Sequence, residues 1–315
     1  MSIPPHLSSA FESVRSAHES AIRSELIVEA RFPHIECFRF EASASAAVSI
    51  WQSLRDRFNE TGHWPLLVSN ADEFIDNAIS TAEAVPTWPA QFRSIQEVCS
   101  TPEEVLAAAE ATPFSKWIER QRDPKRRAEK YRAEADFFEK NCEGSEGIVQ
   151  LNREMAEAAE QEPPFSFDAS RYERPAEQRI PSQDEPFCLT VLDTETWKYI
   201  PAEEVTVLLA PLPACWQFPA WLPFGTGQQQ IQAQAHVAAL KWLFDEIQAE
   251  PVAVSDRCLD VKPRSRPTDW EQALRAAVDL HSWSHATASS ETEFVQPEDL
   301  AVYLMASDYW SLCWP

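Results

Sequence analysis

Apolar residues in the first 80 positions alternate between helical and strand-like spacing. A short helix is predicted over 8–24, and aromatic residues at alternating positions of 37–41 predict a strand. Apolar residues three and four apart from Val48 to Phe58 predict a second helix. Gly62 ends that helix, and 64–68 is typical of a buried strand. The first section is therefore predicted to be a compact β-α-β unit.

The pattern changes after about residue 80. Helices are predicted over 102–111, 113–140 and 146–161, and Thr101-Pro102-Glu103-Glu104 is a strong helix start. Basic residues prevail from Lys116 to Arg132, and acids prevail from Glu134 to Glu162. Such helices can pack as an antiparallel hairpin with attracting charges, or simply present solvated faces. Because their apolar stripes are narrow, we expect residues 100–162 to form an appendage outside the core.

Strands and helices return near the C-terminus, after a proline-rich polar segment over 163–186. Strand-like and helical patterns predict the following elements in this section: strands at 187–193, 205–209, 252–254, 259–262 and 309–314, and helices at 228–249, from Trp270 and from Pro297. In the last strand Trp310, Leu312 and Trp314 share one face, which predicts burial beneath a helix and an interior place in the sheet.

These elements predict an α+β fold with one mixed sheet packed with helices. We expect 1–80 and 187–315 to form a single domain, 81–162 to be an inserted charged helical region, and 163–186 to be a linker.

A run of 36 residues, Val205 to Leu240, contains no Asp, Glu, Lys or Arg. Four prolines from Pro211 to Pro223 exclude a membrane-spanning helix, because a helix in lipid must make all its backbone hydrogen bonds internally and prolines prevent this. An uncharged aromatic loop is typically covered by protein or lines a pocket. The loop over 211–236 is therefore the predicted ligand or partner site, with these residues: Trp216, Trp221, Phe224, Gly225, Gly227 and His236.

The net charge of −23 disfavours binding to nucleic acid and favours a basic protein partner. It is also an ordinary means of keeping a protein soluble. The seven cysteines include no CxxC pair and are odd in number, which predicts reduced thiols. The first residues show neither the basic nor the apolar region of a signal peptide, so the sequence predicts a cytoplasmic protein.

Two possible metal sites lack the residues that would complete them. His281 and His285 have the spacing of two zinc ligands on a helix, but the glutamate of an HExxH motif is absent. Asp193 and Glu195 follow a strand as in proofreading exonucleases, yet the further aspartates are not found at the required spacing. No metal site is predicted.

Other catalytic sets are also incomplete. Cys215 and His236 could meet as nucleophile and base, although the surroundings lack the positive charge that activates a thiolate. Gly225-Thr226-Gly227 is a fragment of a glycine-rich loop without the lysine that would bind phosphates, so no cofactor is predicted.

Several segments occur in a characteristic order: one within 50–70, then Pro219–Gly225, Leu240-Lys241-Trp242, Arg266-Pro267 and the terminal aromatic strand. This order resembles a bacterial family, domain of unknown function 4253. The chain departs from the family where it has Gln228-Gln229-Gln230 and His281-Ser282-Trp283 in place of cysteine-containing motifs. The resemblance covers about 50–70 and 187–315. It implies an α+β domain with the charged helical middle as an insertion, and it implies no particular activity.

The sequence favours a non-enzymatic interaction protein, which could neutralise a basic protein as immunity proteins neutralise secreted nucleases. The alternative is an enzyme with a site under the 211–236 loop, either a hydrolase or a metal-dependent phosphodiesterase.

Overall fold

A computed structural model describes residues 3–175, 184, 186–193, 198–224, 233–255, 258–286 and 296–314. Eight of the strands form one mixed sheet in the order β1-β2-β6-β3-β7-β8-β10-β9. Its strands are β1 (Ile27–Glu29), β2 (Cys37–Ser43), β6 (Glu204–Pro211), β3 (His63–Val68), β7 (Glu250–Val254), β8 (Cys258–Lys262), β10 (Trp310–Cys313) and β9 (His285–Ala286). The β3–β7 pair is parallel, and the other pairs are antiparallel.

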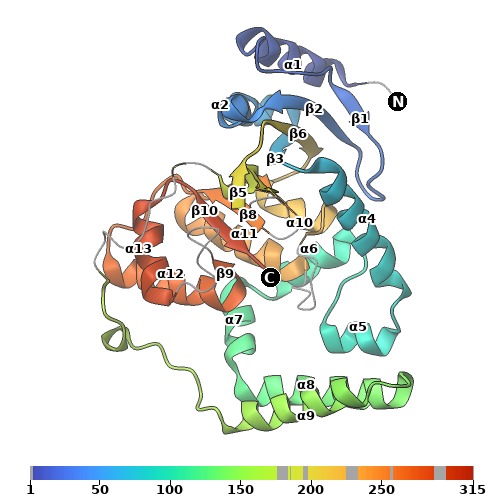
Figure 1. Cartoon of the computed structure of the whole chain (residues 1–315), viewed down its shortest axis with the longest axis vertical. Coiled ribbons are helices and arrows are strands. Elements are labelled where there is room, and N and C mark those ends of the chain that lie inside the picture. The colour runs from blue at the N-terminus through green and yellow to red at the C-terminus, as the bar shows by residue number, and fades with distance from the viewer. Residues whose placement is uncertain are drawn as a thin grey trace.

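Helices pack around this sheet (Figure 1). The N-terminal half contains α1 (Pro5–Ala17), α2 (Ala44–Arg55), α3 (Phe58–Thr61), α4 (Ala71–Thr87), α5 (Ala90–Gln96), α6 (Pro102–Ala111), α7 (Phe114–Arg122), α8 (Pro124–Asn141) and α9 (Glu146–Gln161). The C-terminal half contains α10 (Phe218–Trp221), α11 (Ala233–Ile247), α12 (Trp270–Trp283) and α13 (Pro297–Ala306). A separate pair, β4 (Thr190–Asp193) and β5 (Lys198–Pro201), follows the short 3-10 helix η3 (Phe187–Leu189). The predicted α+β fold is confirmed.

Side chains from both ends of the chain share one core. The six residues of β3 are all buried, because this strand lies inside the sheet. The Trp64 indole donates a hydrogen bond to the carbonyl of Pro251 at 3.1 Å. Arg55 donates two hydrogen bonds to the Glu250 carboxylate, at 2.7 and 2.8 Å. Apolar packing and a bidentate ion pair therefore join the first section to the last.

The predicted helix 113–140 is in fact two helices, α7 and α8. Pro124 has no backbone N–H, so it begins a helix more readily than it continues one. Asp123 precedes it as the N-cap, and its side chain accepts a hydrogen bond from the Lys125 N–H at 3.0 Å. The prediction of one continuous helix was wrong because it gave the Asp123-Pro124 signal too little weight.

The predicted appendage over 100–162 is also too large. Phe114, Trp117 and Ile118 of α7, together with Val105 of α6, are buried in the main core. Removing residues 100–162 would therefore take these side chains out of the core. The prediction failed because three large apolar side chains are enough to anchor a mostly charged helix in the main core.

Helices α8 and α9 do form a projecting pair, which we call the arm. The arm lies at the opposite end of the molecule from α1 (Figure 1). It has a small separate apolar cluster of Ala128, Ala156 and Ala159. Ion pairs Arg132–Glu160, Arg127–Glu162 and Arg153–Glu139 join the two helices. The basic helix therefore attracts the acidic one, as the charge pattern indicated.

The closing strand has the predicted environment. Trp310, Leu312 and Trp314 are all buried, and β10 lies between β8 and β9. The Trp314 indole donates a hydrogen bond to the carbonyl of Trp283 in α12 at 2.9 Å. The prediction of an interior strand covered by a helix is confirmed.

Candidate functional site

The predicted aromatic loop is folded against the body of the protein. The 3-10 helix η4 (Cys215–Gln217) and α10 give it regular structure. Trp216 and Trp221 are half-buried and pack against the core, and the Lys241 ammonium lies 5.5 Å from the centre of the Trp216 ring. Gly225 and Gly227 lie outside the described residues. Trp216 and Trp221 are therefore the described members of the predicted site that retain some solvent contact.

Phe224 and His236 lie inside an aromatic cluster. The His236 ring centre is 4.4 Å from that of Phe224, 4.6 Å from Trp314 and 5.6 Å from Trp283. His236 is 1% exposed, and neither ring nitrogen has a hydrogen-bond partner among the described residues. Burial lowers the pKa of His236 to about 3, so its imidazole is neutral at neutral pH. The two side chains meet, but they offer no outer surface to a partner protein.

Cys215 and His236 do not form a nucleophile–base pair in the part of the chain that is described. Burial raises the pKa of the Cys215 thiol to about 12, which keeps it protonated at neutral pH. A catalytic base would have to accept that proton, whereas His236 makes no hydrogen bond to a described residue.

The possible metal ligands are only partly described. Asp193 ends β4, and its backbone is paired with that of Lys198. The Asp193 side chain and the whole of Glu195 are not among the parts of the chain that the structure describes. His281 lies on α12, and the side chain of His285 is likewise outside it. Across the described residues, no group of three His, Cys, Asp or Glu side chains is placed to hold a metal ion.

An exposed apolar stripe lies along α9 of the arm. Ile148, Leu151 and Met155 are 48%, 55% and 39% exposed, and their spacing places them on one side of the helix. Helix α9 carries four exposed glutamates, Glu146, Glu154, Glu157 and Glu160. Its one cation, Arg153, is paired with Glu139. Sequence reasoning missed this surface because it looked for aromatic residues, although the aliphatic spacing was visible.

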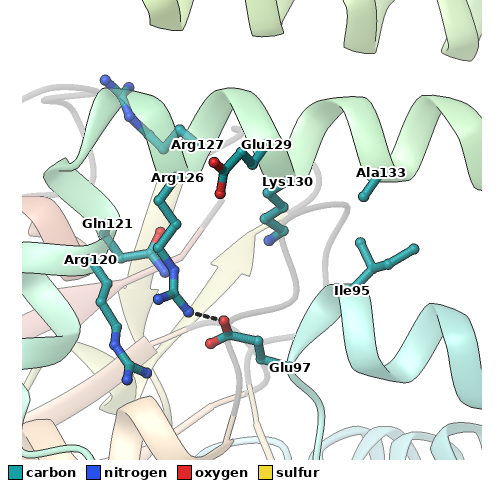
Figure 2. A pocket seen from close by; sticks show the side chains of 9 residues that line it. All are labelled: Ile95, Glu97, Arg120, Gln121, Arg126, Arg127, Glu129, Lys130 and Ala133. Atoms are coloured by element: carbon teal, nitrogen blue, oxygen red, sulfur yellow. Dashed lines mark hydrogen bonds and ion pairs between the residues drawn. The ribbon is translucent and has the colours of Figure 1, made fainter.

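A basic pocket of about 300 Å³ lies at the base of the arm, between α5, α7 and α8 (Figure 2). Its charged lining consists of Arg120, Arg126, Arg127, Lys130, Glu97 and Glu129. Arg126 reaches across the pocket to an ion pair with Glu97, a residue held in the left-handed backbone region at φ 55°. Ile95 and Ala133 form an apolar wall. Sequence reasoning did not predict this pocket, because its residues come from three separate helices.

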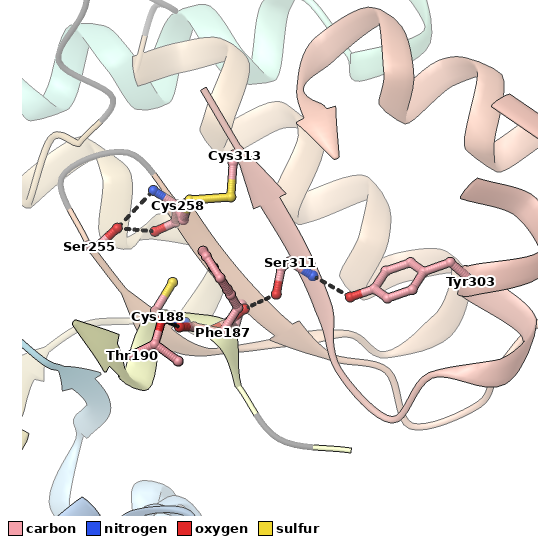
Figure 3. The surroundings of a disulfide bond; sticks show 9 residues. Phe187, Cys188, Thr190, Ser255, Cys258, Tyr303, Ser311 and Cys313 are labelled. Atoms are coloured by element: carbon pink, nitrogen blue, oxygen red, sulfur yellow. Dashed lines mark hydrogen bonds between the residues drawn. A yellow bond between two sulfur atoms is a disulfide. The ribbon is translucent and has the colours of Figure 1, made fainter. Parts of the chain in front are cut away.

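Cys258 and Cys313 form a disulfide (Figure 3). They are directly opposite one another in the β8–β10 pair, with their Cα atoms 4.1 Å apart. The prediction that all the thiols are reduced is wrong for these two. Strand pairing brought the cysteines together from 55 residues apart, which the spacing along the sequence could not reveal.

A buried polar network surrounds Asp260 beside this disulfide. Its carboxylate accepts hydrogen bonds from the Cys188 N–H, at 2.6 Å, and from the Ser311 hydroxyl. Burial raises the pKa of Asp260 to about 6 despite these hydrogen bonds. The Ser311 N–H donates to the Tyr303 hydroxyl (Figure 3). That hydroxyl donates in turn to the Tyr309 carbonyl. The sequence signal for this network was an acid between Leu259 and Val261 in the predicted strand 259–262, and it was overlooked.

The described chain is an α+β protein with a mixed sheet, a projecting arm made of one basic and one acidic helix, and a basic pocket at the arm's base. None of its described helices combines the length and the apolar character needed to cross a membrane. Residues 206–315 match the family described as Domain of unknown function (DUF4253). The predicted resemblance to this family is therefore confirmed over 206–315. No curated protein and no solved structure matches the chain.

Proposed function

We propose that this protein is a non-enzymatic interaction protein that binds a basic partner through α9. The observation that carries the proposal is the exposed stripe of Ile148, Leu151 and Met155 on a projecting helix. Large apolar side chains grouped on one helix face are typical of protein-binding surfaces. The stripe is long enough to take one face of a helix from another protein.

The charge around the stripe defines the partner. Glu160 is paired with Arg132, but Glu146, Glu154 and Glu157 of α9 make no ion pair with a described residue. These three glutamates and the net charge of −23 attract cations and repel acidic proteins. A helix with an apolar face and lysine or arginine on its flanks would complement both features. Neutralisation of a basic protein, in the manner of an immunity protein, is one biological form that this binding would take.

A designed probe tests the proposal directly. A labelled peptide of about 18 residues, five helical turns, would carry leucine at helical spacing and lysine elsewhere. Its fluorescence anisotropy should rise on adding the protein. A matched peptide with glutamate in place of lysine should not bind.

Variants separate the stripe from general charge attraction. The double substitution Ile148→Ala and Leu151→Ala should weaken binding at least about fivefold, or about 1 kcal/mol, if these residues are interface anchors. Ile27→Ala is the matched control, because Ile27 is an exposed aliphatic residue on β1 and is 48% exposed. Equal affinity of the double variant and the control would contradict the proposal. Self-association of the protein through the stripe, detected by sedimentation, would also contradict it, since the occupant would then be a second copy.

A further inference from the structure

The pocket at the base of the arm carries a charge opposite to that of the whole protein. Four cations and two carboxylates line it, whereas the chain has a net charge of −23. Figure 2 shows Arg126 and Lys130 extending from α8 into the space above Glu97, with Arg120 extending from α7 beside them. A local excess of positive charge within an acidic protein concentrates anions at that place.

The cations of this pocket are not fully used by the protein. Arg120 makes no ion pair with any described carboxylate, and its Nη1 atom donates a long hydrogen bond, 3.5 Å, to the Thr112 hydroxyl. Lys130 lies 3.8 Å from Glu134, beyond hydrogen-bond distance. The Nε atom of Arg127 is buried without a hydrogen-bond partner in the described part of the chain. Donor capacity therefore remains for a further acceptor.

The position of these cations on α8 is unfavourable for the helix alone. Lys125, Arg126 and Arg127 lie in its first turn, which contains no acidic residue after the cap. The N-terminal end of a helix has a positive partial charge, so cations there reduce helix stability and anions restore it. An anion in the pocket would thus interact favourably with the side chains and with the helix end.

We propose that this pocket binds a small molecule carrying a phosphate group. Guanidinium groups match phosphate oxygens in geometry and charge, and Arg120 and Arg126 extend toward this space from two helices, whereas the Arg127 guanidinium points away from it and pairs with Glu162. The volume of about 300 Å³ is at the lower end of the range for small-molecule sites. Ile95 and Ala133 supply an apolar wall for the organic part of the molecule. The Glu97 carboxylate competes with the phosphate for Arg126.

Isothermal titration calorimetry with inorganic phosphate and with phenyl phosphate tests this inference. Both are compared with sodium chloride at the same ionic strength. Heat of binding should appear with both phosphates, and phenyl phosphate should bind more tightly because its ring can contact the apolar wall. Binding of inorganic phosphate with no gain from the phenyl group would overturn the assignment to an organic phosphate.

Substitutions then locate the site. Combined Arg120→Gln and Lys130→Gln should weaken phenyl phosphate binding at least about tenfold, through loss of two charged contacts. Glu97→Gln should strengthen it, because the competing carboxylate is removed. Arg275→Gln makes the same charge change as Arg120→Gln at an exposed position on α12 and should leave the affinity unchanged. Circular dichroism confirms that each variant is folded.

The inference fails if the double variant binds phenyl phosphate as tightly as the wild-type protein. It also fails if the wild-type protein gives no more heat with millimolar phenyl phosphate than with chloride. Neither result bears on the α9 surface, which the leucine–lysine peptide tests separately.

Discussion

The Ser311 hydroxyl donates a hydrogen bond to the Asp260 carboxylate across the β8–β10 pair. Both side chains are fully buried, so this contact and the Cys188 N–H replace the water that an aspartate would otherwise bind. The replacement is incomplete, since burial still raises the pKa of Asp260 to about 6 from 3.8. The sheet therefore contains an acid whose protonation affects folding.

The protonation of Asp260 predicts a dependence of stability on pH. The folded protein holds this proton up to about pH 6, while the unfolded chain releases it near 3.8. The resulting stabilisation is complete below pH 3.8 and is lost as the pH rises through 6. The free energy of unfolding of wild type relative to Asp260→Asn should fall by about 2 kcal/mol between pH 4 and 6.5. Urea unfolding at several pH values measures it, and parallel curves for the two proteins would contradict it.

His236 predicts the opposite dependence. Its pKa falls from 6.5 to about 3 on folding, so the unfolded chain binds the proton first as the pH is lowered. Stability is therefore present above pH 6.5 and is lost toward pH 3. Relative to His236→Leu, the wild-type protein should lose about 3 kcal/mol between pH 7 and pH 4. At pH 7 the leucine variant should be at least as stable as wild type, because two unsatisfied buried nitrogens are removed. A strongly destabilised variant at pH 7 would show that His236 has a polar partner.

Trp310 is a test of the core around the closing strand. Its side chain has 0% exposure, so Trp310→Ala should reduce the free energy of unfolding by about 3 to 5 kcal/mol. Trp270→Ala is the control, because Trp270 is only partly buried at the start of α12. The control should lose clearly less stability in the same urea titration. Similar losses would indicate that Trp310 is not a central core residue.

The disulfide predicts a specific count of thiols. Purified protein, denatured without reductant, should show five reactive thiols, those of Cys37, Cys99, Cys142, Cys188 and Cys215. Reduction should lower the free energy of unfolding by about 2 to 4 kcal/mol, because the link no longer restricts the unfolded chain. The combined Cys258→Ser and Cys313→Ser variant should not respond to reductant, whereas Cys142→Ser should respond like wild type. Seven reactive thiols would contradict the pairing.

The sequence predicted the fold well where buried residues recur at the regular spacing of a strand or a helix. The alternation around Trp310 placed the closing strand correctly, and the spacing in α9 gave its bounds at residues 146 and 161. The pattern was less informative in α7, because Phe114 and Trp117 reach the core from a helix that is mostly charged. A charged composition describes the solvent face of a helix and says little about the few residues beneath it.

The site residues were harder to predict because they depend on contacts distant in sequence. The uncharged composition of 211–236 predicts a loop that is covered by protein or lines a pocket, and Phe224 is indeed buried. The same composition could not show that His236 is packed among aromatic rings, away from any partner. Glu97 and Arg126 meet only because α5 and α8 pack together. No local spacing contains that information. The stripe at Ile148 was accessible to sequence reasoning, since it follows the helical period of its own segment.

The central claim is that α9 of the arm contacts a basic partner. Site-specific photocrosslinking in the native host tests it. A benzophenone amino acid is placed at Leu151, which is 55% exposed, and, as the control, at Ile27 on β1, which is 48% exposed. The account predicts a covalent adduct from position 151 alone. The adduct should contain a protein of net positive charge whose purified form binds wild type and loses affinity for the variant with Ile148→Ala and Leu151→Ala. Identical adducts from both positions, an acidic partner, or a second copy of this chain would contradict it.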